Sequence, residues 1–244
     1  TGGCASRAYA GCTDHRIVVD LADEWGVTAG VAAGTVARVL HVDPAVSAGD
    51  RIAVGDTLGR LTRSGFFGRW VANHLHLGFR PPGADAVRAS GSLAVAVGAG
   101  GGGGGWDGTG TVVETGPTHV VVGGRDHPEP GDRFAAPASD EAVPPDARLC
   151  HYAGGGTFRE EPVPAAVSLW GTRVGTRTEQ GLEWEPVDVV VDGARVVGLS
   201  LFAGIDDFGV KVVCPDHDLV VGDRVTVGTE PSTDPIRLGR DDRA

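Results

Sequence analysis

The sequence contains no methionine and no long apolar run. A membrane-spanning helix needs about 20 consecutive apolar residues, so we expect no transmembrane segment. Without an initiator methionine, we expect Thr1 to be a processed or cut end, and a signal peptide is neither seen nor excluded.

Basic residues are also scarce: 21 Lys and Arg stand against 32 Asp and Glu, for a formal charge of −11. Neutralising nucleic-acid phosphates requires clustered basic side chains, so we expect no nucleic-acid partner. Lys211 is the only lysine.

The four cysteines form no C-x-x-C pair, which argues against a zinc ribbon or a thioredoxin-like motif. They permit two disulfides in three connectivities, and the alternative of mostly free thiols stays open. These residues are Cys4, Cys12, Cys150 and Cys214.

The chain is typical of an all-β protein of one large or two small domains. Short runs rich in valine alternate with Gly, Pro and Asp, whereas long helical periodicity is hard to find. Asp192-Gly193 lies between VDVVV (187–191) and ARVVGLSLF (194–202), and this dipeptide favours a type I′ hairpin turn.

Glycine is abundant, with 40 residues, and residues 98–105 form a nearly pure glycine tract closed by Trp106. Gly-rich chain loses much entropy on ordering, which favours a connector. We therefore predict a domain over 1–96, a linker over 97–106 and a β-rich domain of unknown function over 107–244. A long hairpin loop within one domain is the alternative.

The segment NHLHLGFR (73–80) is the most specific indication of a functional site in the sequence. On a strand, His74 and His76 point to one face, whereas Leu75 and Leu77 point to the other and suit a core. Neutral imidazole is a zinc ligand, so this segment predicts one wall of a metal site.

Four segments precede this motif in a characteristic order: HRIVVDLADEWG (15–26), GTVARV (34–39), VSAGDRIAVGDTLG (46–59) and SGFFG (64–68). Together with the H-x-H, this order resembles the lysostaphin-type, or LytM-like, zinc endopeptidases. The similarity spans about residues 12–82.

The resemblance implies a small antiparallel β domain of the barrel-sandwich hybrid type with one Zn²⁺. It implies that His15, Asp20 and His76 are the metal ligands and that His74 is the general base. It further implies hydrolysis of a peptide bond, by family resemblance in a cell-wall peptide, and favours an extracytoplasmic or cell-envelope location.

The sequence departs from the family pattern at two places that bear on whether the zinc site forms and is active. Four residues separate His15 from Asp20, where the family has three, so a β-bulge near Val18 and Val19 is required for both side chains to converge. The hairpin that carries a transition-state histidine in the family is shortened here, and His41 is the candidate to replace it.

Three alternatives follow. A lipoyl or biotinyl carrier shares these turns but needs a lysine at a hairpin tip, and Lys211 lies far outside the matching region, which excludes that function. A catalytically inactive LytM-like binding or assembly module remains open. So does an envelope- or carbohydrate-binding β protein that uses four tryptophans as stacking platforms: Trp70, Trp106, Trp170 and Trp184.

Overall fold

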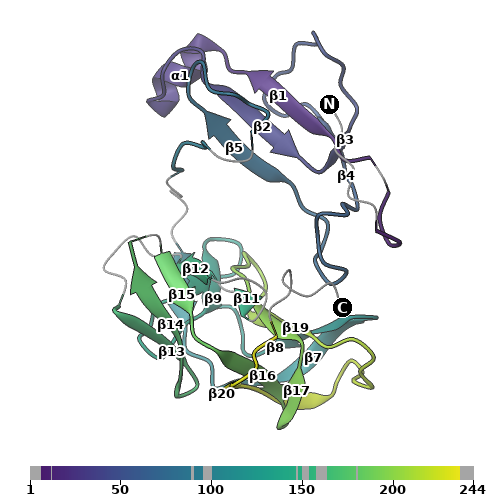
Figure 1. Cartoon of the computed structure of the whole chain (residues 1–244), viewed down its shortest axis with the longest axis vertical. Coiled ribbons are helices and arrows are strands. Elements are labelled where there is room, and N and C mark those ends of the chain that lie inside the picture. The colour runs from purple at the N-terminus through teal and green to yellow at the C-terminus, as the bar shows by residue number, and fades with distance from the viewer. Residues whose placement is uncertain are drawn as a thin grey trace. The chain divides into compact units, whose positions relative to one another are not determined.

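The computed structural model divides into two compact units, residues 1–96 and 97–244, which are shown in Figure 1. Each is treated separately. The structure describes residues 7–11, 13–88, 91–95, 101–146, 148–149, 154–157, 164–179 and 181–236.

The N-terminal unit is built around a three-stranded antiparallel sheet in the order β1-β2-β5, with β3 and β4 forming a separate antiparallel pair. Its helix ends at Gly30, whose φ of 67° is the left-handed C-cap conformation. The elements of this unit are β1 (Arg16–Asp20), α1 (Asp23–Ala29), β2 (Val36–Leu40), β3 (Val42–Pro44), β4 (Gly59–Leu61) and β5 (His76–Arg80).

The C-terminal unit contains an eight-stranded sheet (β11-β18-β19-β8-β7-β20-β16-β17), a five-stranded sheet (β10-β12-β15-β14-β13) and the pair β6-β9. Its strands are β6 (Gly101–Gly104), β7 (Thr109–Gly116), β8 (His119–Gly123), β9 (Phe134–Pro137), β10 (Pro145–Asp146), β11 (Arg148–Leu149), β12 (Gly154–Thr157), β13 (Ala166–Leu169), β14 (Thr172–Thr178), β15 (Gly181–Trp184), β16 (Val187–Val191), β17 (Ala194–Val196), β18 (Gly198–Leu201), β19 (Gly209–Val213) and β20 (Arg224–Pro231).

The predicted all-β fold is confirmed, since α1 is the one α-helix in the described ranges. The expected hairpin is present: Asp192 (φ 50°) and Gly193 (φ 80°) connect β16 to β17, and both have the positive φ of a type I′ turn. In the same ranges, no helix is long and apolar enough to cross a membrane.

The glycine tract differs from the predicted linker. Gly101–Gly104 form β6, which pairs in parallel with β9 and belongs to the C-terminal unit. A Cβ on Gly103 would lie 2.9 Å from Cβ of Ala138, and one on Gly104 would lie 3.0 Å from the ring of Phe208. Here glycine permits close packing. The predicted linker positions 97–100 lie outside the described residues.

The two units bury different kinds of side chain. The C-terminal core consists mainly of valine and leucine side chains with Trp184 and Cys214, and Val122 and Val189 are fully buried in it. In the N-terminal unit the described buried side chains include many polar ones. They are Asp14, Thr35, His41, Ser64 and Arg80, beside the apolar Ala37, Val39, Val42 and Phe67.

The prediction that Leu75 and Leu77 pack into a core is wrong. Their exposed fractions are 47% and 54%. Leu77 pairs with Val39, which is buried, so the burial on this face of the sheet decreases toward its edge strand β5.

Candidate functional site

A buried carboxylate–imidazole pair lies at the end of β2. Nδ1 of His41 is 2.6 Å from Oδ2 of Asp14, and the two residues are 6% and 7% exposed. With Asp14 ionised, the carboxylate can only accept, so Nδ1 of His41 donates, and in the neutral imidazole Nε2 then carries the lone pair. The pair thus selects one tautomer of His41.

The backbone of His41 is held in an unusual conformation. Its φ is 66°, a left-handed value that is unfavourable for a residue with a Cβ. The amide of His41 donates to the carbonyl of His15 at 3.3 Å, and its carbonyl accepts from the amide of Thr62 at 3.1 Å. Such strain persists only where the surroundings over-determine it, and it is concentrated at functional sites.

Ser64 completes the environment of Asp14. The Ser64 hydroxyl donates to Oδ2 of Asp14 and also accepts from the amide of Phe66 at 3.1 Å. The second carboxylate oxygen, Oδ1 of Asp14, is buried without a hydrogen-bond partner in the described residues. Two donors therefore converge on one oxygen while the other is unsatisfied.

The H-x-H pair lies beside this network, just before and at the start of β5. Nδ1 of His74 is 2.8 Å from the carbonyl oxygen of Ala72, which can only accept, so Nδ1 donates. Nε2 of His74 is 3.0 Å from Nε2 of His76. In the neutral state, His76 must donate this hydrogen bond to His74.

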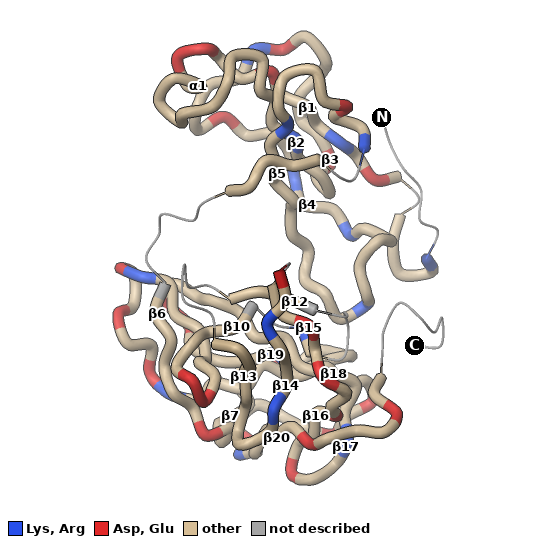
Figure 2. The backbone as a smooth tube through the Cα atoms, turned by 60° about the vertical axis from the view of Figure 1, so that its left-hand side comes forward, with Lys and Arg blue, Asp and Glu red and all other residues tan. Residues whose placement is uncertain are grey.

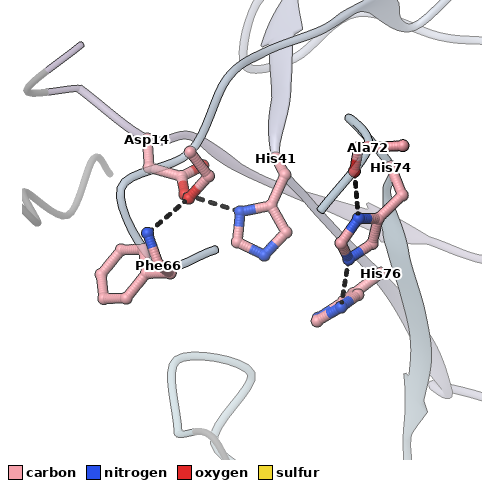
Figure 3. A network of polar contacts seen from close by, with 7 residues as sticks. Asp14, His41, Phe66, Ala72, His74 and His76 are labelled. Carbon is pink, nitrogen blue, oxygen red and sulfur yellow. Dashed lines mark hydrogen bonds and ion pairs between the residues drawn. The ribbon is translucent and has the colours of Figure 1, made fainter. Parts of the chain in front are cut away.

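Phe67 packs the three imidazoles together. Its ring is stacked on His74 with centroids 4.1 Å apart and meets His41 edge-on at 4.5 Å. The His41 ring lies 4.9 Å from that of His76 and 6.1 Å from that of His74. Figure 3 shows His41 with Asp14 on one side and His74 and His76 on the other. We call Asp14, His41, His74 and His76 the histidine cluster.

The structure does not bring Asp20 into this cluster. β1 and β2 pair in continuous register from Arg16↔Leu40 to Asp20↔Val36, without the required bulge. His76 pairs with Leu40, so Asp20 lies at the opposite end of the sheet, about 13 Å along the strand direction at ~3.3 Å per residue. Asp20 is exposed.

His15 contacts His41 through its backbone carbonyl, but its side chain faces a residue outside the cluster. Its Nε2 faces Oδ1 of Asp43 at 3.8 Å, and the two side chains are 35% and 72% exposed. With an unbulged strand, a spacing of five sends the side chains of His15 and Asp20 to opposite faces. The expected ligand set of His15, Asp20 and His76 is therefore not assembled.

The other side chains described near the histidine cluster do not form an alternative set of metal ligands. No group of three or more His, Cys, Asp and Glu side chains is arranged to hold a metal ion in the portion of the chain that the structure describes. Asp14 uses Oδ2 for His41 and Ser64, so in this arrangement the carboxylate orients the imidazole of His41. The implied Zn²⁺ does not fit these residues as they stand.

Sequence reasoning missed Asp14 and Ser64. Asp14 lies next to His15 in sequence, but it comes before the strand, where periodicity carries no information. Ser64 lies in the SGFFG segment that supported the family resemblance, yet its contact with Asp14 spans 50 positions. A buried acidic residue beside a histidine could be found only from tertiary structure.

The tryptophans of the third alternative have structural partners. Trp184 is only 4% exposed and belongs to the C-terminal core. Trp106 and Trp170 meet edge-on at 5.6 Å, and their Nε1 atoms donate to the carbonyls of Thr109 and Trp106. These three indoles therefore stabilise the fold.

Comparison with protein families gives two matches. Residues 1–97 match the N-terminal domain of a family described as a domain of unknown function (DUF8155), and residues 103–230 match the C-terminal domain of the same family. No curated protein and no solved structure matches the chain.

Proposed function

The chain belongs to the DUF8155 family, and we propose that its N-terminal unit is a non-catalytic binding module of lysostaphin-type resemblance. The observation that carries this proposal is the position of Asp20. It lies one strand length from His76 on an unbulged β1, so the carboxylate expected to complete the zinc site is absent from the histidine cluster.

The hydrogen bonding of the cluster supports a binding role. His41, Asp14 and Ser64 form a closed network around one carboxylate oxygen, and His74 is tied to the Ala72 carbonyl. A zinc endopeptidase needs three protein ligands and an open fourth position for water. Here the acidic group instead orients an imidazole, which rigidifies the site without supplying a ligand.

Zinc-dependent hydrolysis of a cell-wall peptide is the second candidate. One observation favours it: the 3.0 Å separation between Nε2 of His74 and Nε2 of His76. Two ligands bound at ~2.0–2.1 Å in a tetrahedral site are about 3.3 Å apart. This candidate requires a third protein ligand, which His41 would have to supply; its ring centroid lies 4.9 Å from that of His76.

Two measurements on the full chain separate these functions. We expect less than one equivalent of zinc to remain after dialysis against a zinc-free buffer, and no cleavage of a panel of cell-wall peptides in zinc-containing buffer. One retained equivalent of zinc together with cleavage, both lost in His76→Ala, would overturn the proposal. His217→Ala is the matched control, because His217 binds the Gly116 carbonyl in the other unit.

A further inference from the structure

The two edges of the β1-β2-β5 sheet differ in what lies beside them. β1 and β5 are on opposite sides of β2, as Figure 1 shows. The edge at β5 is covered in part, because the amide of Leu93 donates to the carbonyl of Phe79 at 2.9 Å. Within the described residues, β1 pairs with β2 and with no other strand. An edge of this kind is a template for pairing with another chain.

The hydrogen bonds to β2 determine which backbone groups of β1 point outward. Just before β1, the amide of His41 donates to the carbonyl of His15 at 3.3 Å. Just after β1, the amide of Leu21 donates to the carbonyl of Thr35 at 3.4 Å. Hydrogen-bonded and non-hydrogen-bonded pairs alternate along an antiparallel ladder, so the odd-numbered residues of β1 bond to β2. The even-numbered residues direct their N–H and C=O groups away from β2: Arg16, Val18 and Asp20.

β1 lacks features that commonly protect an edge strand. Its sequence, RIVVD, contains no proline and no lysine, and its register with β2 is continuous, without a bulge. In the described part of the C-terminal unit, the end strands of the two larger sheets have two to four residues, against five in β1. Val18, at the centre of β1, is 44% exposed. Long, flat and unprotected edges favour association.

The sequence of β1 is complementary to itself in the antiparallel direction. When two copies pair around Val18, Arg16 lies opposite Asp20 of the second copy, and Ile17 lies opposite Val19. In this register each residue with outward backbone groups meets another such residue, so each of these pairs can exchange two hydrogen bonds. Directly opposed β-branched side chains and opposite charges both stabilise a sheet.

The charges at the ends of β1 favour this register over its neighbours. Pairing centred on Arg16 or on Asp20 would place like charges directly opposite each other, which is destabilising. Moving the centre to Ile17 or Val19 would place one charge opposite Val18 and the other beyond the partner strand. Figure 2 shows both basic and acidic positions on the N-terminal unit around β1.

The state of the two charged side chains is compatible with such a pairing. Asp20 is exposed, and none of the ion pairs found in the described part of the chain includes it. Arg16 donates from Nη1 to the neutral carbonyl of Val87 at 2.7 Å. The preference for the register depends on the sign of these charges and does not require an unoccupied nitrogen on Arg16.

We propose that the chain forms a two-fold symmetric dimer in which β1 pairs antiparallel with β1 of a second copy, centred on Val18. The two three-stranded sheets then form one continuous sheet of six strands, and each contact occurs twice. An edge of five residues is small beside the ~1,200 Å² of a standard interface, so we expect a weak dimer with a Kd of about 10–100 µM. No member of the histidine cluster lies on β1, so this proposal does not depend on the proposed function.

Sedimentation equilibrium of the full chain tests the proposal. The protein is measured from about 5 µM to about 500 µM, with a reducing agent present to exclude disulfide-linked dimers. We expect monomer at the lowest concentration and a reversible increase toward the mass of a dimer. A chain that remains monomeric throughout overturns the proposal and leaves this edge to a different protein.

Substitutions at Val18 localise the interface. Val18→Pro removes an outward N–H without removing a hydrogen bond to β2, a position at which an edge strand tolerates proline. We expect at least tenfold weaker dimerisation. Val18→Thr keeps the N–H and the branched shape, and as the matched control it should dimerise within about twofold of the wild type. Unchanged dimerisation of folded Val18→Pro overturns the assignment to β1.

A charge reversal tests the register. Asp20→Lys places a cation opposite Arg16 of the second copy and should weaken dimerisation at least fivefold at low salt. The difference from the wild type should decrease at about 0.5 M sodium chloride, because salt screens exposed charges. Glu183→Lys makes the same change at an exposed position on β15 and should dimerise as the wild type does. Equal affinities of Asp20→Lys and the wild type would contradict the register centred on Val18.

A measurement on the wild type covers the case in which Val18→Pro does not fold. Deuterium uptake by peptides that span β1 should be slower at about 500 µM than at about 5 µM, because pairing protects the outward amides. Peptides that span the central strand β2 should exchange equally at both concentrations. Dimerisation without added protection in β1 would place the interface elsewhere and overturn the proposal.

Discussion

Nδ1 of His41 and Oδ2 of Asp14 are 2.6 Å apart, and both side chains are buried. This pair connects the segment before β1 to the end of β2, and Ser64 binds the same carboxylate from the loop after β4. Asp14 therefore ties three separate parts of the N-terminal unit together.

Replacing Asp14 with alanine should destabilise the N-terminal unit. Asp14→Ala leaves the Nδ1–H of His41 and the hydroxyl of Ser64 buried without an acceptor, and we expect a loss of about 1–3 kcal/mol in its free energy of unfolding. Urea unfolding followed by circular dichroism measures the change. Asp43→Asn is the control, because Asp43 is 72% exposed and should change stability by less than ~0.5 kcal/mol. Equal effects of the two variants would contradict the role of Asp14.

The left-handed backbone of His41 predicts an inverted order of two substitutions. Both His41→Ala and His41→Gly lose the imidazole, but glycine adopts a φ of 66° without a Cβ penalty. His41→Gly should therefore be more stable than His41→Ala by about 1 kcal/mol. At the exposed β4 position Leu61 the usual order should hold, with Leu61→Ala more stable than Leu61→Gly. If the alanine variant is the more stable one at both positions, His41 does not have the left-handed backbone conformation described above.

The features of the fold that could be predicted from the sequence are those set by residues close together in the chain. The β16–β17 hairpin was predictable because Asp192-Gly193 determines its turn through two neighbouring φ angles. The proximity of His74 and His76 was predictable for a similar reason, since two positions along an extended chain suffice.

Features that depend on distant parts of the chain were not predictable. The glycine tract was expected to be a linker because its composition favours flexibility, but Gly101–Gly104 pair with Phe134–Pro137, about 33 residues later. Likewise, family spacing selected Asp20 as a ligand, whereas the register of β1 with β2 decides where that carboxylate lies. Neither pairing leaves a local signal.

His119 on β8 predicts a pH dependence of the C-terminal unit. Burial lowers the pKa of His119 below 6.5, and the charge of Lys211 lowers it further. The unfolded chain therefore takes up a proton at a pH where the folded chain resists it, so stability is fully present above 6.5 and falls as the pH drops through the folded pKa. Urea unfolding at about pH 7.5 and pH 5 should show that the free energy of unfolding decreases less for His119→Gln than for the wild type. The same loss in both proteins would exclude His119 as the cause.

Cys214 on the C-terminal side of β19 should be chemically inert in the folded chain. Burial raises the pKa of its thiol to about 11, so almost no thiolate exists near neutral pH. Iodoacetamide at about pH 8 should leave Cys214 unmodified in the native protein and modify it fully in urea, as read by peptide mass spectrometry. Rapid native modification would show that the β19 end opens or that the thiol is not buried.

Native mass spectrometry of zinc binding determines whether Asp20 takes part in the chemistry of the histidine cluster. Wild type and Asp20→Ala, each mixed with one equivalent of Zn²⁺, should retain the same low fraction of zinc, and His76→Ala should lower that fraction further. One tightly held zinc per wild-type chain that disappears in Asp20→Ala would show that Asp20 is a ligand and that the lysostaphin-type site forms.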